Sequence, residues 1–151
     1  MSSLKAQLQA DLTAAMKGRD ELTAATLRMA LSAITTEEVA GKAARELSDE
    51  DVVAVLGKEA KKRRESAEAY DAAARPELAD RERAELGVLD RYLPEPLTPE
   101  QIELIVTAAV AHAQVSGPQG MGAVMKLVTP QVRGRADGGA VAAAVRAALG
   151  S

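Results

Sequence analysis

The octapeptide VRGRADGG, residues 132–139, combines the residue types that anion binding requires. Arg133 and Arg135 supply positive charge, and three glycines let the backbone come close to a ligand. Asp137 can cap a helix that begins directly after it, and a helix N-terminus offers exposed N–H groups to anions. The octapeptide therefore predicts either a phosphate-facing loop or a turn that only joins two helices. The Asp137 carboxylate competes with an anion for the same amides, which counts against a phosphate at the helix N-terminus and leaves the two arginines as the better candidates.

The charge around this octapeptide is uneven. From residue 119 to the C-terminus cations outnumber acids by three, whereas residues 94–118 contain three glutamates and no lysine or arginine. The end of the chain is thus basic, although the net charge of the whole chain is −3. A protein that binds nucleic acid needs such a local basic surface. The residues predicted to contact nucleic acid are Lys126, Arg133, Gly134, Arg135 and Arg146.

A second basic run contains Lys61, Lys62, Arg63 and Arg64 in succession. Consecutive residues on a helix point to different sides, so this run does not form a single basic stripe. Glutamates four residues after Lys61 and Arg64 can pair with them. Two interpretations remain: a solvated helix with salt bridges on its surface, or a secondary contact to a nucleic-acid backbone.

Other kinds of chemistry have little support. Without cysteine the chain has no disulfide, thiolate nucleophile or zinc–cysteine site. His112 is the single histidine, and it falls among alanines where a partly exposed surface position is expected. No serine can be matched with a general base, and no nucleotide-binding loop is present. We therefore expect no catalytic residue, no metal site and no cofactor.

Composition predicts an all-α fold. The chain has 151 residues, of which 47% are hydrophobic, with no Phe and no Trp. Many of the apolar residues are alanine, the strongest helix former, so helices must pack closely through small side chains. No apolar run approaches the roughly 20 residues that a membrane span needs. A cytoplasmic protein without a membrane partner is the expectation.

Hydrophobic spacing predicts two helical hairpins in the first part of the chain. Leu4, Leu8, Leu12 and Met16 recur at every fourth position, which predicts a first helix that ends near Gly18. Further helices are expected after three residues typical of helix starts, namely Asp20, Ser48 and Pro76. The helices that follow Ser48 and Pro76 carry many charges and predict a long polar hairpin over residues 48–93.

The stretch YLPEPLTPEQ, residues 92–101, predicts the main boundary of the chain. Three prolines interrupt the helical pattern, and Thr98, Pro99 and Gln101 form a helix start with a cap, a first-turn proline and a capping-box partner. Two helical subdomains are expected, residues 1–93 with the hairpins and residues 97–151 with three helices.

Four blocks spread over the chain resemble the GatB/YqeY family, and in particular its small stand-alone YqeY-like proteins. They are TLRMALSAITTEEVA (26–40), ELSDEDVVAVLGKEAKKRRESAEAY (46–70), AELGVLDRYLPEPLTPEQI (84–102) and MGAVMKLVTPQVRGRADGGAV (121–141). The family pattern of Gly, Met, a basic residue and a Gly-basic-Ala turn matches seven positions. These are Gly122, Met125, Lys126, Arg133, Gly134, Arg135 and Ala136.

This resemblance implies a function in tRNA metabolism. The last part of the chain is similar to the helical, tRNA-contacting tail of the B subunit of tRNA-dependent amidotransferases. Those enzymes are carbon–nitrogen ligases that use glutamine as amide donor, and their chemistry belongs to other domains or subunits. The resemblance thus implies a tRNA-binding module, or an accessory of an amidotransferase or another tRNA-processing enzyme. One departure is that the last helix contains a single cation, Arg146, so few phosphate contacts are expected.

An adaptor that binds a protein through the hairpin of residues 48–93 is the alternative function. The two hypotheses differ in their dependence on salt. Binding to tRNA should weaken steeply as salt rises, because each neutralised phosphate releases counterions. An apolar protein interface should tolerate salt and depend on buried apolar side chains.

Overall fold

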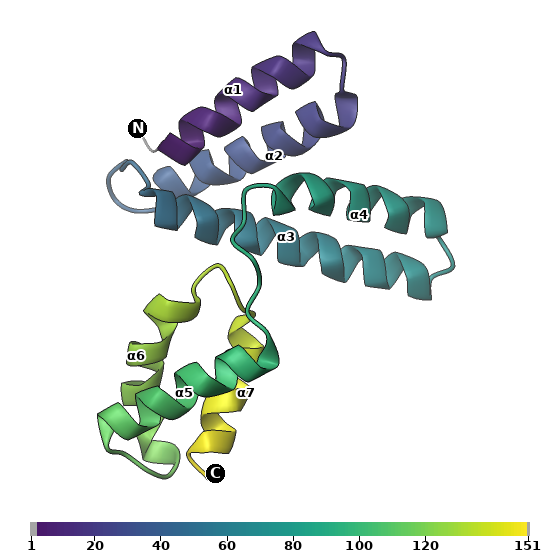
Figure 1. Cartoon of the computed structure of the whole chain (residues 1–151). Helices are drawn as coiled ribbons and strands as arrows, with labels where there is room; N and C mark the ends of the chain where they lie inside the picture. Colours follow the sequence, from purple (N-terminus) through teal and green to yellow (C-terminus); the bar gives the residue numbers. More distant parts are fainter. Residues whose placement is uncertain (1–2, 151) are drawn as a thin grey trace. The chain divides into compact units, whose positions relative to one another are not determined.

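The computed structural model describes residues 3–150, which form seven α-helices and one short 3-10 turn and contain no strand (Figure 1). The predicted all-α fold is confirmed. The chain divides into two compact units, residues 1–93 and residues 94–151, here called the N-terminal unit and the C-terminal unit. The C-terminal unit thus includes residues 94–96, which lie between the two predicted subdomains.

The first two helices of the N-terminal unit form an antiparallel pair, as their spacing predicts. Helix α1 spans Ser3–Lys17 and α2 spans Glu21–Glu38. The Asp20 carboxylate accepts a hydrogen bond from the Thr23 amide at the start of α2, so the predicted cap is confirmed. Met16, the last residue of the four-residue spacing that predicts α1, does not join the buried face of the helix. Its side chain is 53% exposed, and Ala15 is buried in its stead because the stripe shifts by one position at the end of the helix.

The next two helices form the hairpin that the sequence predicts. Helix α3 spans Asp49–Ala72 and α4 spans Pro76–Asp90. Ser48 caps α3 and exchanges hydrogen bonds with Asp51 in a capping box, while Pro76 opens α4. In Figure 1 the two helices lie side by side along most of their length. Helix α2 packs on both of them and so joins the two hairpins of the unit.

Leucine side chains dominate the core of the N-terminal unit. Leu8, Leu27, Leu56 and Leu89 come from the four different helices, and all are fully buried in one cluster. Charged groups also lie inside this unit, since Glu59 and Arg63 of α3 and Glu85 of α4 are at most 9% exposed. The core therefore combines leucines with buried charge.

The C-terminal unit is a bundle of three helices. Helix α5 spans Pro99–Ala113, α6 spans Met121–Val132 and α7 spans Gly138–Ala148, with the 3-10 turn η1 at Pro118–Gly120 before α6. The predicted capping box of Thr98 and Gln101 is formed at the start of α5. Figure 1 shows α6 running toward the turn at residues 133–137 and α7 running back from it, with α5 packed on both helices.

Small branched side chains fill the core of this bundle. The predicted four-residue spacing on α7 is confirmed, because Val141, Val145 and Leu149 are all buried. They pack with valines of α6 and with Ile102 and Val106 of α5. None of the described helices is long and apolar enough to cross a membrane.

Candidate nucleic-acid interface

The turn between α6 and α7 ends the first helix and starts the second. Gly134 has φ of +78°, a conformation that costs other residues energy. It directs the amides of Arg135 and Ala136 back to the Val132 carbonyl oxygen, at 2.9 and 3.1 Å. These bonds satisfy a carbonyl that the end of α6 would otherwise leave open. Gly134 thus has an architectural role that explains its presence without a ligand.

The same turn is bound to the segment that precedes α5. The Leu97 amide donates to the Arg135 carbonyl oxygen at 2.8 Å, and Arg135 Nε donates to the Glu95 carbonyl oxygen at 3.3 Å. Arg135 is half-buried, whereas Arg133 is exposed. The two arginines of the octapeptide therefore differ in exposure, and the side chain of Arg135 is the more buried of the two.

The N-terminus of α7 is capped by its own sequence. The Asp137 carboxylate accepts a hydrogen bond from the Ala140 amide at 3.3 Å, as predicted. A phosphate at this helix terminus would meet the negative charge of that carboxylate, which opposes binding. The surface cations, and not the amides of α7, are the better groups for an anion.

Lys126 of α6 and Arg133, the residue that directly follows α6, lie on one face. They are seven residues apart, which is close to two full turns and about 10 Å along the helix axis. Thr129 and Pro130 lie between them on this face, and all four residues are exposed. No acidic residue occurs in α6, so the helix itself does not offset the charge of these two cations. We call this surface the α6 face.

Arg146 lies away from the turn. It is exposed in the last turn of α7, whereas Arg133 and Arg135 precede the first turn of that helix. The 11 residues of α7 extend over about 16 Å. Arg146 therefore contributes at the opposite end of the unit and not to the turn itself.

The basic run of α3 is not a uniform charged surface. Arg63 is 4% exposed, and its Nη1 donates to the carbonyl oxygen and to the carboxylate of Glu59, at 3.0 and 3.2 Å. Lys62 pairs with the same carboxylate at 3.0 Å from the outside. Lys61 and Arg64 are exposed. Burial thus removes Arg63 from the predicted secondary contact, because α2 and α4 cover that side of α3.

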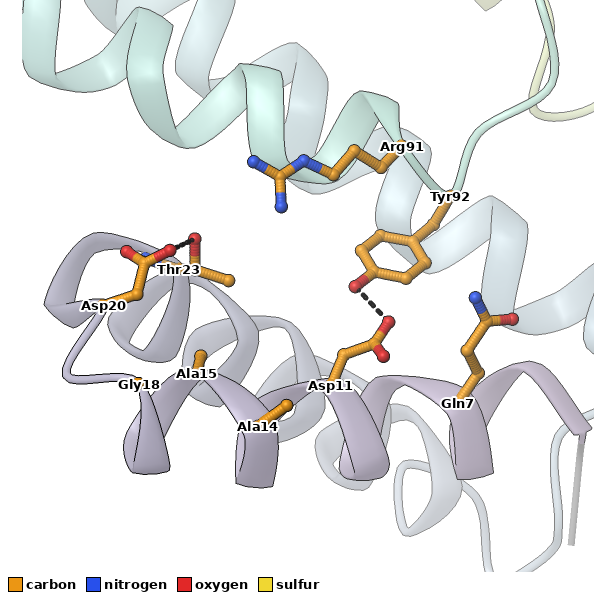
Figure 2. A pocket seen from close by; sticks show the side chains of 9 residues that line it. All are labelled: Gln7, Asp11, Ala14, Ala15, Gly18, Asp20, Thr23, Arg91 and Tyr92. Carbon is orange, nitrogen blue, oxygen red and sulfur yellow. Dashed lines mark hydrogen bonds between the residues drawn. The ribbon is translucent and has the colours of Figure 1, made fainter.

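Sequence reasoning missed a groove in the N-terminal unit. Figure 2 shows that it lies between α1, the start of α2 and the end of α4, and its volume is about 570 Å³. Tyr92 donates its hydroxyl to the Asp11 carboxylate at 2.6 Å across this groove. Burial, and then this hydrogen bond, raise the pKa of Tyr92 to about 12. No local motif signals the groove, since its two sides are 81 residues apart in the chain.

The other end of the groove contains Asp20 and Thr23. The Thr23 hydroxyl and amide both donate to the Asp20 carboxylate and hold its pKa below the ordinary value, with a smaller contribution from the charge of Arg91. The carboxylate is thus ionised at neutral pH. Among residues 3–150 the structure finds no group of three or more side chains that could hold a metal ion. His112 is exposed near the end of α5, as the sequence predicts.

The model of the family described as Yqey-like protein matches residues 5–149, nearly the whole chain. The chain therefore belongs to the YqeY-like family. It is also 36% identical over 94 residues to an uncharacterized protein of Schizosaccharomyces pombe, an alignment that covers 62% of this chain and 74% of the yeast protein.

Proposed function

We propose that the C-terminal unit binds the phosphate backbone of RNA, with tRNA as the target that the family resemblance favours. The α6 face carries this proposal, because Lys126 and Arg133 are exposed and aligned, and α6 contains no acid. Arg135 and Arg146 extend the positive surface to either side. Lys61, Lys62 and Arg64 of α3 supply the secondary contact.

The number of cations on the unit predicts weak and salt-sensitive binding. Three phosphate contacts correspond to a fall in affinity of about 20- to 40-fold between roughly 50 and 200 mM salt. Such a module gains useful affinity beside a partner that also holds the RNA. Accessory action on a tRNA-dependent amidotransferase or another tRNA-processing enzyme fits this need, and autonomous catalysis is not part of the proposal.

Fluorescence anisotropy of labelled tRNA, titrated at these two salt concentrations, tests the proposal. Lys126→Ala/Arg133→Ala should lose most of the binding, because it removes both cations of the α6 face. The matched control is Lys17→Ala/Arg19→Ala, which removes two exposed cations from the N-terminal unit and should bind like the wild type. Arg135 is changed separately, since its bond to Glu95 also fixes the turn.

Absence of binding at the lower salt contradicts the proposal, and so does equal loss in the control variant. The accessory role has its own measurement, which is the rate of tRNA amidation by an amidotransferase with and without this protein. An unchanged rate of amidation together with salt-sensitive tRNA binding would support RNA binding and contradict the accessory role on the amidotransferase.

The adaptor function has less support from the surface of the hairpin. Protein interfaces obtain most of their energy from buried aromatic and large apolar side chains. Within the hairpin of residues 48–93, Leu78 is the one large apolar side chain found exposed, at 39%. Binding of a partner protein that persists at high salt and is lost in a Leu78→Asp variant would favour the adaptor function over RNA binding.

A further inference from the structure

The groove of the N-terminal unit has the form of a small-molecule site. Its floor consists of Ala14, Ala15 and Gly18, which are small enough to leave open space above α1 (Figure 2). The volume of about 570 Å³ lies within the range of pockets that hold small ligands. All of its lining residues belong to the N-terminal unit, so the groove is separate from the α6 face.

Arg91 is the cation among the residues that line this groove. Figure 2 shows its guanidinium extending over the floor, between Thr23 on one side and Tyr92 on the other. No hydrogen bond or ion pair is found for it among residues 3–150, although the exposed arginine Arg83 forms ion pairs with Asp71 and Asp80. A guanidinium presents five N–H donors in a planar fork that suits a carboxylate.

Two carboxylates flank this guanidinium. Asp11 lies toward one end of the groove, with Gln7 beyond it, and one of its oxygens accepts the Tyr92 hydroxyl. Asp20 lies at the other end, where both of its oxygens accept hydrogen bonds from Thr23. A carboxylate has about four acceptor positions, so both acids keep room for further donors. Along the groove the guanidinium of Arg91 therefore lies between the carboxylates of Asp11 and Asp20.

This pattern selects the charge of a ligand. A simple anion would meet two carboxylates, and a diamine would meet the guanidinium between them. A molecule with one carboxylate and two cationic groups matches all three positions and leaves no net charge. Asp11 and Lys17 are about 9 Å apart along α1, and Asp20 follows three residues after the end of that helix. An extended basic amino acid has the length to approach both aspartates.

We propose that this groove binds a basic α-amino acid of the lysine or arginine type. Arg91 receives the α-carboxylate, and Asp11 and Asp20 receive the two cationic groups. Gln7, which also lines the groove, adds an amide beside Asp11. The site is independent of RNA binding by the C-terminal unit.

The test is a nuclear magnetic resonance titration of the ¹⁵N-labelled full chain at constant ionic strength. L-lysine and L-arginine should produce saturable shifts at Gly18, Thr23 and Tyr92. L-norleucine has the size of lysine but lacks its side-chain ammonium, and cadaverine lacks the carboxylate. Each should bind at least about fivefold more weakly than L-lysine, because each loses one ion pair in an open groove.

Variants locate the site. Arg91→Gln and Asp11→Asn should each weaken L-lysine binding at least about fivefold. Arg81→Gln is the matched control, since Arg81 is exposed on the same helix, α4, but does not line the groove. All three variants should keep the wild-type spectrum elsewhere, which separates lost binding from lost folding.

Three results would overturn the proposal: no saturable shift with L-lysine or L-arginine, equal binding of norleucine or cadaverine, or equal loss in Arg81→Gln. Because the ligands are free amino acids and the readout lies in the N-terminal unit, the outcome does not depend on the tRNA measurement. Failure of one proposal leaves the other in place.

Discussion

The N-terminal and C-terminal units are both helical but place charge in opposite ways. All buried polar or charged side chains of residues 3–150 belong to the N-terminal unit, and they are Thr23, Thr26, Glu59, Arg63 and Glu85. In the C-terminal unit the buried side chains are apolar, and three of the four cations are exposed. Clusters of basic residues in the sequence therefore have different environments in the two units. In the N-terminal unit one member of the cluster, Arg63, is buried in the core, whereas in the C-terminal unit most of the cations are on the surface.

The largest effect should come from disrupting the buried pair of the N-terminal unit. Arg63→Ala leaves the largely buried Glu59 without its inner partner and opens space between α2 and α3. We expect a loss of about 3 kcal/mol in the free energy of unfolding. Urea denaturation followed by tyrosine fluorescence measures it, since both tyrosines, Tyr70 and Tyr92, belong to this unit.

Two variants refine this expectation. Lys62 is the outer partner of Glu59, and the side chain of Lys62 is 71% exposed. Lys62→Ala should therefore lower the free energy of unfolding by less than about 0.5 kcal/mol. Arg63→Met keeps the volume and removes Nε, which has no hydrogen-bond partner, so it should cost less than Arg63→Ala. Equal costs for Arg63→Ala and Lys62→Ala would show that the buried charge of the N-terminal unit contributes no more to its stability than an exposed charge does.

The apolar core of the C-terminal unit predicts the next effect. Val128→Ala deletes two buried methyl groups between helices and should cost about 2 kcal/mol. Hydrogen exchange measured by mass spectrometry should show faster exchange in α5, α6 and α7. The control Val39→Ala, at a side chain that is 60% exposed, should change stability by less than about 0.5 kcal/mol. Equally faster exchange in α1–α4 would show that the two units unfold together.

Two glycines of the octapeptide should respond with opposite signs. Gly134→Ala places a side chain at φ of +78° and should cost about 1–2 kcal/mol. Gly138 begins α7, and no other group lies within 4 Å of the position that a Cβ would take there. Gly138→Ala should therefore stabilise the unit by about 0.4–1 kcal/mol. Thermal unfolding followed by circular dichroism compares them. A neutral Gly134→Ala would contradict the architectural role of this residue.

The smallest effect concerns alkaline pH in the N-terminal unit. The folded-state pKa of Tyr92 is raised to about 12 from an ordinary value of 10, so the fold favours the neutral phenol. This contribution is complete below pH 10 and is lost as pH rises toward 12. Tyr92→Phe should lack that alkaline loss. Ultraviolet titration of Tyr70→Phe, in which Tyr92 is the sole tyrosine, gives the pKa directly, and a value near 10 would contradict the prediction.

Local signals in the sequence predict most helix boundaries of this protein. Asp20, Ser48, Thr98 and Asp137 all cap helices, because a cap depends on residues within one turn of each other. Four-residue apolar spacing likewise predicts the buried face of α7. Met16 continues the same spacing on α1 but is exposed, because burial there depends on which neighbour covers the last turn of the helix, and spacing does not contain that information.

The two basic regions show that the sequence predicts only part of the candidate nucleic-acid interface, because the burial of a charged side chain depends on neighbouring helices. Lys126 of α6 and Arg133, which directly follows α6, are both exposed, and their seven-residue spacing places them on one face because it is close to two helical turns. The difference between Arg63 and its basic neighbours arises because α2 and α4 cover one side of α3 only. The groove around Arg91 depends still more on distant contacts, since Tyr92 meets Asp11 from the far end of the unit.

Sequence alone is enough to establish that this chain is helical, where most of its helices begin and which face of α7 is apolar. These properties follow from interactions over three or four residues. The assembled fold was needed to show that Arg63 is buried, that Arg135 holds the turn to Glu95, and that Arg91 faces two acids. Those outcomes require segments far apart in the chain to come together, and the burial or pairing of a charge is set by the groups that then surround it.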